Sequence, residues 1–291
     1  MFKSGNFTNV EQISLAKEIA LIGVQATPLT SMLMAKGNIE KALSTVYSWR
    51  EKTLDSADDL SAVEGEDTTV FFESARAELS NILEIFKKGA SITGTAIAMK
   101  SSQLAEEVND RLLELKINME KKFINGVKAD GSLTPFKRQM SGLIEFADAA
   151  NDVSQAGGAV VEQTIKDVMK NLWDQDLAEG TYYALVNADI KEDVDAIYTD
   201  RYQYNHVTTN FGLLVDSVST NYGTVNFILS KHVPTDKMVV FNDSYVDLAY
   251  LREPQFEALA KTGDSIKGHV VAETTLKVAS AKGVAVVTVT A

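Results

Sequence analysis

Histidines are the first residues to test for chemistry, because they serve often as metal ligands and as general bases. The sequence has three, His206, His232 and His269, and none has a second histidine at the short spacing of a helical zinc site. A metal site built from them would need three distant segments to converge. We therefore interpret them as surface or hydrogen-bonded structural histidines and expect no metal site.

Other local signatures of catalysis and cofactor binding are also missing from the sequence. There is no cysteine, which excludes disulfides, thiolate metal sites and a cysteine nucleophile. No Gly-X-Ser-X-Gly elbow, no phosphate-binding Gly-X-X-X-X-Gly-Lys-Ser/Thr loop and no other Gly-rich cofactor loop occurs. We expect no catalytic residue, no cofactor and no enzyme activity, so that function resides in interfaces.

Three short features could have a chemical role but have simpler interpretations. The acidic run of residues 55–67 could hold Ca²⁺, yet its carboxylates do not follow the order of a calcium loop, and a solvated hairpin tip is favoured. Residues 262–264, Thr-Gly-Asp, resemble short phosphoryl-transfer signatures, but Gly-Asp is a routine turn. Trp49, beside Arg50, and Trp173 could bind a ligand; as strand and core residues they need no such role.

Composition and charge indicate a folded soluble protein and disfavour a dedicated DNA-binding protein. The length of 291 residues suits one large or two to three small structural units. The hydrophobic fraction of 45% is ordinary for a folded protein. The formal net charge of -12 leaves no basic footprint to neutralise phosphates. We find no signal peptide and no apolar run long enough to span a membrane, so we expect no membrane association. The absence of cysteine fits a cytoplasmic location.

Two elements stand out among those that the sequence predicts. Period-two alternation between Ser44 and Leu54, the acidic run, and strand-forming residues 68–72 predict a long hairpin with an acidic tip. Such a hairpin cannot bury two faces on its own chain, so it needs a neighbouring subunit. Apolar residues at spacings of three and four predict a helix of about six turns from Ser101 or Ser102 to Asn125.

The remaining elements make a mixed α+β architecture. The expected helices cover residues 9–24, 161–179 and 189–198, with Pro28 breaking the first and a short helical piece at residues 257–261. The expected strands, which include a stretch interrupted at Gly89, cover residues 78–98, 182–186, 223–229, 238–241, 269–278 and 284–290. Because strands occur both before the long helix and at the end of the chain, we expect the last strands to pack against the middle of the chain.

Several segments, taken in order, resemble the major head proteins of tailed bacteriophages. They are Thr27-Pro28-Leu29, Ser91 to Ala96 before the long helix, Lys137 to Leu143 after it, and residues 257–276 near the end. The resemblance covers nearly the whole chain. It implies the Hong-Kong-97-type shell fold, which is shared with encapsulins.

The resemblance also implies a division of the chain. Residues 1–43 would form an N-terminal arm, 44–90 an extended loop hairpin with a return strand, and 91–134 a peripheral domain whose spine is the long helix. Residues 135–250 would form an axial domain, and residues 251–291 would be strands that return to the peripheral domain.

The function implied is that of a major capsid subunit. It would assemble with itself into pentamers and hexamers of an icosahedral or prolate head that encloses double-stranded DNA, with scaffolding, portal and possibly decoration proteins as partners. Its place would be the virion, after assembly in the host bacterial cytoplasm. Two alternatives stay open: an encapsulin-like compartment shell, and a soluble acidic α+β enzyme.

Overall fold

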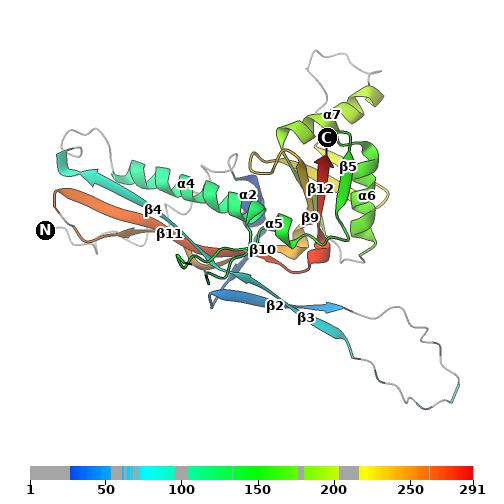
Figure 1. Ribbon diagram of the computed structural model, residues 1–291, viewed down its shortest axis with the longest axis horizontal. Helices are drawn as coiled ribbons and strands as arrows, with labels where there is room; N and C mark the ends of the chain where they lie inside the picture. Colours follow the sequence, from blue (N-terminus) through cyan, green and yellow to red (C-terminus); the bar gives the residue numbers. More distant parts are fainter. Residues whose placement is uncertain are drawn as a thin grey trace.

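The chain forms a mixed α+β structure (Figure 1), with three sheets among the residues described below. The computed structural model describes residues 27–53, 61, 64–65, 67, 71, 73–95, 104–132, 134–175, 180–202, 216–261 and 263–290. A long flat sheet with one helix along it occupies one end, a compact sheet with flanking helices the other, and a hairpin projects away from both. The predicted α+β class is confirmed.

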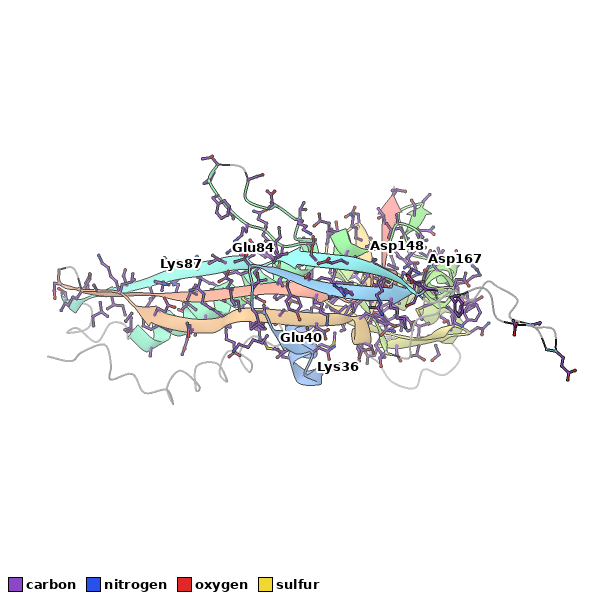
Figure 2. The ribbon with its side chains drawn as sticks, turned by 90° about the horizontal axis from the view of Figure 1, so that it is seen from below. Lys36, Glu40, Glu84, Lys87, Asp148 and Asp167 are labelled. Atoms are coloured by element: carbon purple, nitrogen blue, oxygen red, sulfur yellow. The ribbon has the colours of Figure 1, made fainter. Side chains whose placement is uncertain are left out.

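The long sheet has four strands in the order β1-β10-β11-β4. Their bounds are β1 Ile39–Lys41, β4 Glu84–Thr93, β10 Val246–Ala258 and β11 Ser265–Val278. Strands β10 and β11 form an antiparallel hairpin, β4 pairs antiparallel with β11, and the short β1 is parallel to β10. Figure 2 shows Glu40 and Lys36 at the β1 edge and Glu84 and Lys87 on β4 at the opposite edge.

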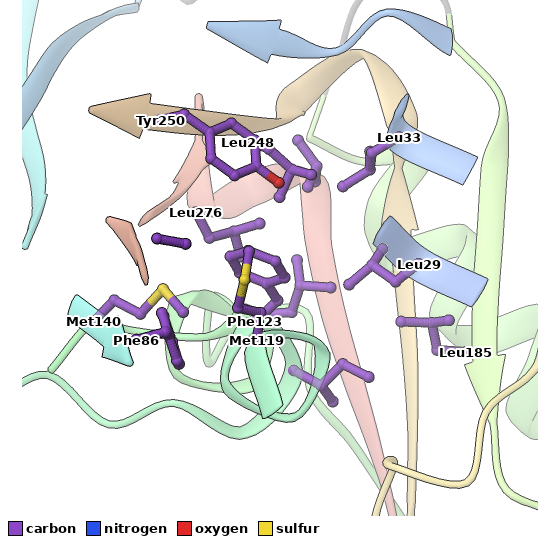
Figure 3. Close-up of a cluster of buried hydrophobic side chains, with 14 of the residues drawn as sticks. Leu29, Leu33, Phe86, Met119, Phe123, Met140, Leu185, Leu248, Tyr250 and Leu276 are labelled. Atoms are coloured by element: carbon purple, nitrogen blue, oxygen red, sulfur yellow. The ribbon is translucent and has the colours of Figure 1, made fainter. Parts of the chain in front are cut away.

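Helix α4, Leu104–Asn125, covers one face of this sheet and confirms the predicted long helix. Its apolar stripe faces the sheet because side chains three and four residues apart share one side of a helix. Leu112, Leu115 and Phe123 are buried there. Figure 3 shows this core, to which distant parts of the chain contribute the labelled Leu29, Leu33, Phe86, Met119, Phe123, Met140, Leu185, Leu248, Tyr250 and Leu276.

The compact sheet has six strands in the order β5-β12-β9-β6-β8-β7. They are β5 Val153–Ala156, β6 Tyr182–Val186, β7 Ser217–Thr220, β8 Gly223–Leu229, β9 Lys237–Asn242 and β12 Val284–Thr290. Helices α6, Glu162–Trp173, and α7, Ala188–Tyr202, flank it (Figure 1), and a second hydrophobic cluster fills the space between. Short helices α5, Leu143–Phe146, η2, Asp243–Tyr245, and η3, Ala281–Gly283, complete the fold.

The last strands are divided between the two sheets. Strand β11 lies in the four-stranded sheet, whereas β12 pairs with β9 and β5 in the six-stranded sheet. The resemblance implies that residues 251–291 are strands that return to the peripheral domain, a division taken up again under the proposed function. Strand β12 joins the compact sheet because Ala285 and Val287 belong to the apolar cluster between that sheet and its helices.

Pro28 begins a helix in the structure. Helix α2, Pro28–Lys36, has Pro28 in its first turn, where the missing N–H would have no intrahelical partner and the fixed φ suits a helix. Leu29 and Leu33 are fully buried in the main core. The expected helix at residues 9–24 lies outside the described residues.

Three other boundaries differ from the sequence predictions. The helical piece expected at residues 257–261 is wrong, because β10 continues to Ala258, where pairing with β11 outweighs the helix propensity of Glu-Ala-Leu-Ala. Gly89 does not interrupt β4, which pairs with β11 on both sides of it. Helix α6 ends at Trp173, six residues before the expected end.

Candidate assembly surfaces

The projecting hairpin is the most prominent surface of the molecule. Strands β2, Val46–Thr53, and β3, Ala75–Ile82, pair antiparallel in register over eight residues and form a sheet of their own. Figure 1 shows this hairpin extending away from both larger sheets. A two-stranded sheet is marginal in water unless something packs on it.

The paired strands of the hairpin are held by contacts with their own chain. Trp49 contacts Phe146 of α5 with ring centroids 6.1 Å apart, and Ser280 Oγ donates a hydrogen bond to Glu51 Oε1 over 2.5 Å. Lys128 Nζ donates to the carbonyl of Ser80 at 2.8 Å. The expectation that the hairpin finds no support on its own chain therefore holds only for its outer part.

A charged network extends this anchoring to the sheet. Lys277 Nζ lies 2.6 Å from Glu40 Oε1 and 3.1 Å from Asp247 Oδ2, and the Tyr47 hydroxyl donates to Glu40. Partial burial works against the ionised carboxylate, but the hydrogen bonds from Lys277 and Tyr47 hold the pKa of Glu40 below its ordinary value. The network ties β1, β2 and the four-stranded sheet together.

The outer part of the hairpin makes few contacts with the described part of its chain. Lys52 and Arg76 are directly opposite each other, both exposed, and neither forms an ion pair with a described residue. Like charges at paired positions destabilise an isolated sheet. Beyond them, the Phe71 side chain is 84% exposed. Phe71 and these two cations therefore leave the outer part of the hairpin without a partner among the described residues.

The N-terminal segment is attached to α4 by a buried carboxylate. Glu120 Oε1 accepts a hydrogen bond from the Leu29 N–H at 2.8 Å, and Oε2 accepts one from the Thr30 N–H at 2.9 Å. These are backbone donors of the first turn of α2, which lack intrahelical partners. Burial raises the pKa of Glu120 above its ordinary value, against the effect of these hydrogen bonds.

Sequence reasoning did not identify this carboxylate. Glu120 lies in α4, for which the sequence predicted only a helix with an apolar stripe. The pattern of α4 alone could not reveal it, because the partner is a helix about ninety residues earlier in the chain. A carboxylate inside an otherwise apolar stripe is the only local signal.

A second set of contacts links α2 to the start of β10. Lys36 Nζ donates to Asp243 Oδ2 and lies 4.4 Å from the centre of the Tyr183 ring. The Asn38 side chain donates to the carbonyls of Asp243 and Val246 at 2.7 and 3.0 Å. Residues 28–41 therefore bridge the two larger sheets where the chain passes from β9 to β10.

The two described histidines, His232 and His269, lie on separate elements. His269 lies on β11 with Nε2 3.2 Å from Glu257 Oε2, and the His232 carbonyl accepts a hydrogen bond from the Asn125 side chain in the turn after β8. His206 lies outside the described residues. Among the residues that the structure describes, no group of three metal-binding side chains exists.

The Thr-Gly-Asp turn, the acidic run and Trp49 were the other candidate sites in the sequence. Gly263 has φ of +85° in the turn between β10 and β11, and Asp264 continues that turn, with Thr262 outside the described residues. Of the acidic run, only Glu64 and Asp67 among the carboxylates are described, so calcium binding there stays untested. Trp49 is half-buried beside Phe146, with Arg50 exposed next to it.

The interpretation of Trp173 as a core residue is wrong. Its side chain is 58% exposed and contacts Tyr222 with ring centroids 5.8 Å apart. It follows Leu172 at the C-terminal end of α6, one position beyond the buried stripe.

In the described part of the chain, no helix is long and apolar enough to cross a membrane.

Comparison with known proteins gives one family match. The family described as SU10 major capsid protein matches residues 3–291. No curated protein sequence is significantly similar to the chain.

Solved structures show the same fold at low sequence identity. A virus-like particle protein from Pyrococcus furiosus superposes with a TM-score of 0.59 at 8% identity, covering 97% of this chain and 99% of that one. The SrpI encapsulin from Synechococcus elongatus PCC 7942 gives 0.60 at 14% identity, covering 86% and 84%. A structure from Mycobacterium phage Bobi gives 0.59 at 15% identity, covering 88% and 90%.

Proposed function

The chain belongs to the SU10 major capsid protein family, and from this premise we propose how the subunit builds a shell and what the shell contains. The protein is a structural capsid subunit of the virion, with the Hong-Kong-97-type fold that the sequence predicted. Copies of it assemble into a multimeric shell. The proposal concerns the capsomers, the contents and the surfaces that make the contacts.

We propose that the subunits assemble as pentamers and hexamers of a closed head enclosing double-stranded DNA. The observation that supports this is the family match over nearly the whole chain, residues 3–291. The charge supports the contents: a chain of net charge -12 gives a wall that repels packaged DNA and lets it move, whereas a basic wall would bind it.

The hairpin β2–β3 provides the main contact between subunits in this proposal. Its paired strands are held to the body through Trp49 and Glu51, so it leaves the body in a defined direction. Its outer part carries Lys52 and Arg76, which form no ion pair with a described residue, and the exposed Phe71. A hairpin with fixed strands and an exposed end can make the same contact in every copy, as a closed symmetric assembly requires.

The division into arm, extended loop, peripheral domain and axial domain also remains a proposal. The four-stranded sheet with α4 corresponds to the peripheral domain, and the six-stranded sheet to the axial domain. Strand β12 then belongs to the axial domain, and α2 is the fixed root of the N-terminal arm. Scaffolding, portal and decoration proteins are the further partners, and the host bacterial cytoplasm is the place of assembly.

Catalysis has no part in this proposal. The family and the fold are those of structural proteins, and the described histidines lie on separate elements with structural contacts. Function then resides in the interfaces, with no cofactor or metal required.

Electron microscopy of the purified protein tests the proposal. We expect closed particles with five-fold and six-fold capsomers, and nuclease-resistant double-stranded DNA in heads made with the full set of head proteins. Light scattering that shows only monomers over a range of salt and protein concentrations would contradict shell formation. Particles that hold a folded cargo protein instead of DNA would favour the encapsulin-like alternative, which the shared fold with SrpI keeps as the second candidate.

A further inference from the structure

A short loop with an exposed aromatic side chain projects beside β4, the edge strand of the four-stranded sheet. It comprises residues 127–132 and 134–138, between α4 and α5, and Figure 2 shows it standing out near the labelled Glu84. The Phe136 side chain is 75% exposed and that of Val127 is 64% exposed. On β4, Ile85 is 48% exposed. Single exposed apolar residues are common, but several in one region are typical of a binding surface.

Hydrogen bonds and packing hold this loop in one conformation. Its two arms are joined by backbone hydrogen bonds in both directions between Ala129 and Gln139, 3.0 and 2.9 Å long. At the tip, Gly131 has φ of +84°, and a Cβ there would lie only 3.1 Å from the Phe136 ring, so that the ring packs directly on the glycine. A fixed aromatic side chain loses little entropy when a partner binds it.

A buried carboxylate joins the loop to the sheet. Glu273 of β11 accepts a hydrogen bond from Arg138 Nη2 at 2.9 Å and lies 3.3 Å from Arg252 Nε. Ile85 is directly opposite Glu273 on β4, and Lys87 is two residues further along β4, on the same face. The loop and the exposed residues of β4 therefore form one continuous surface.

This surface is cationic, although the chain as a whole is acidic. Two nearby carboxylates, Glu84 and Glu273, are buried. The exposed carboxylates Asp130 and Glu145 each accept a backbone N–H of the loop. Three lysines are exposed and form no ion pair with a described residue: Lys87, Lys128 and Lys137. An acidic partner would complement these charges.

The direction of the loop argues against another copy as its partner. Figure 1 is viewed down the shortest axis of the molecule, and Figure 2, turned by 90°, shows the loop standing out along that axis. Copies in a one-layer shell lie side by side along the two longer axes. DNA fits less well than protein, because its phosphates would contact the lysines and leave Phe136, Val127 and Ile85 without apolar contacts.

We propose that this loop docks an acidic segment of a second protein of the head, with an apolar side chain of that segment packed on Phe136. The inference rests on the proposed function, because it needs the one-layer shell. The carboxylates of the segment lie against Lys87, Lys128 and Lys137. In such a contact the charges set orientation and association rate, while the buried aromatic anchor supplies much of the affinity.

Peptide binding to assembled shells tests the docking. The probe is a fluorescently labelled peptide of alternating Glu and Leu, and fluorescence anisotropy measures its dissociation constant. We expect saturable binding at least about tenfold tighter than that of the same peptide with Ser in place of Leu, or with Lys in place of Glu. A short labelled DNA duplex, measured in the same buffer, should bind more weakly than the Glu-Leu peptide.

Matched variants locate the binding site. Phe136→Ser and Lys137→Glu should each weaken peptide binding at least about tenfold. Trp173→Ser changes another exposed aromatic residue, and Lys261→Glu changes an exposed lysine between β10 and β11; both should bind the peptide like the parent. Circular dichroism checks the fold of each variant, and Lys87→Glu replaces Lys137→Glu if that variant does not fold.

The outcomes separate this inference from the proposed function. Parent protein that forms no shells would contradict the proposed function and remove the basis of this inference. Parent shells that do not bind the Glu-Leu peptide, or that bind the DNA duplex more tightly, would contradict only the docking. Folded Phe136→Ser subunits that no longer assemble would show that another copy covers Phe136, which would also overturn it.

Discussion

Helix α4 and the hairpin β2–β3 are both long elements, and they differ in what covers them. The apolar stripe of α4 is buried by the four-stranded sheet and by α2, with Leu112 2% exposed. The outer hairpin keeps Phe71 and the charges of Lys52 and Arg76 in solvent. The burial of its apolar stripe shows that α4 serves the stability of the subunit, whereas the outer hairpin is the part that we propose contacts other copies.

The largest effect on folding is expected for a charge placed in the α4 stripe. Leu112→Asp puts an unpaired carboxylate in the main core, at a cost of several kcal/mol against a typical total of roughly 5–15 kcal/mol. We expect an insoluble or unfolded subunit by circular dichroism. Asn118→Asp, on the exposed side of the same helix, is the control and should fold normally. Soluble, assembled Leu112→Asp shells would show that this face is not covered.

A smaller loss is expected when α4 releases α2. Glu120→Ala leaves the Leu29 and Thr30 N–H groups without their acceptor, which should lower the free energy of unfolding by on the order of 3 kcal/mol. Chemical denaturation measures it, with exposed Glu114→Ala on the same helix as the control. Equal stability of Glu120→Ala and the parent would mean that the carboxylate does not hold the segment.

The same carboxylate should give stability a distinct pH dependence. Since burial raises the pKa of Glu120, the folded state binds its proton more tightly than the unfolded state. Its contribution to the unfolding free energy therefore falls as the pH rises from about 4.3, the ordinary value, through the raised folded pKa. The free energies of unfolding of the parent and Glu120→Gln, measured over this range, should differ by an amount that changes with pH. A difference that stays constant would contradict this pH dependence.

The histidines should matter less. Exchange of His206, His232 and His269 together for Gln or Asn should leave shell formation nearly intact, with stability losses of about 1 kcal/mol per buried site. Measurement of assembly by light scattering and of stability by denaturant titration checks this. Loss of a hydrolytic or metal-dependent activity that the parent has would contradict a purely structural role.

The smallest effect on folding, with the largest effect on assembly, is expected for the hairpin tip. Deletion of residues 54–72 keeps the anchored strands β2 and β3, including the Trp49 contact with Phe146. We expect an unfolding free energy within about 0.5 kcal/mol of the parent, as for other surface changes, and no closed shells. A destabilised subunit would show that the removed segment belongs to the core. Normal shells would contradict the proposal that the hairpin makes the main contact between subunits.

Periodicity and turn residues determined much of the fold from the sequence. Leu112, Leu115 and Phe123 at helical spacing identified α4, and alternation around Trp49 identified the first hairpin strand, because one face of each element must be apolar. The absence of cysteine and of catalytic motifs excluded several function classes, and the ordered resemblance led to the capsid family.

Only the tertiary structure decided which segments meet. The attachment of α2 through Glu120, the division of β11 and β12 between two sheets, and the anchored hairpin base each join residues far apart in the chain. Local patterns report which face of an element is apolar but not which partner covers it, since long-range pairing is set by competition among all surfaces. For the same reason, the exposure of Trp173 and Phe71 became visible only once the chain had packed.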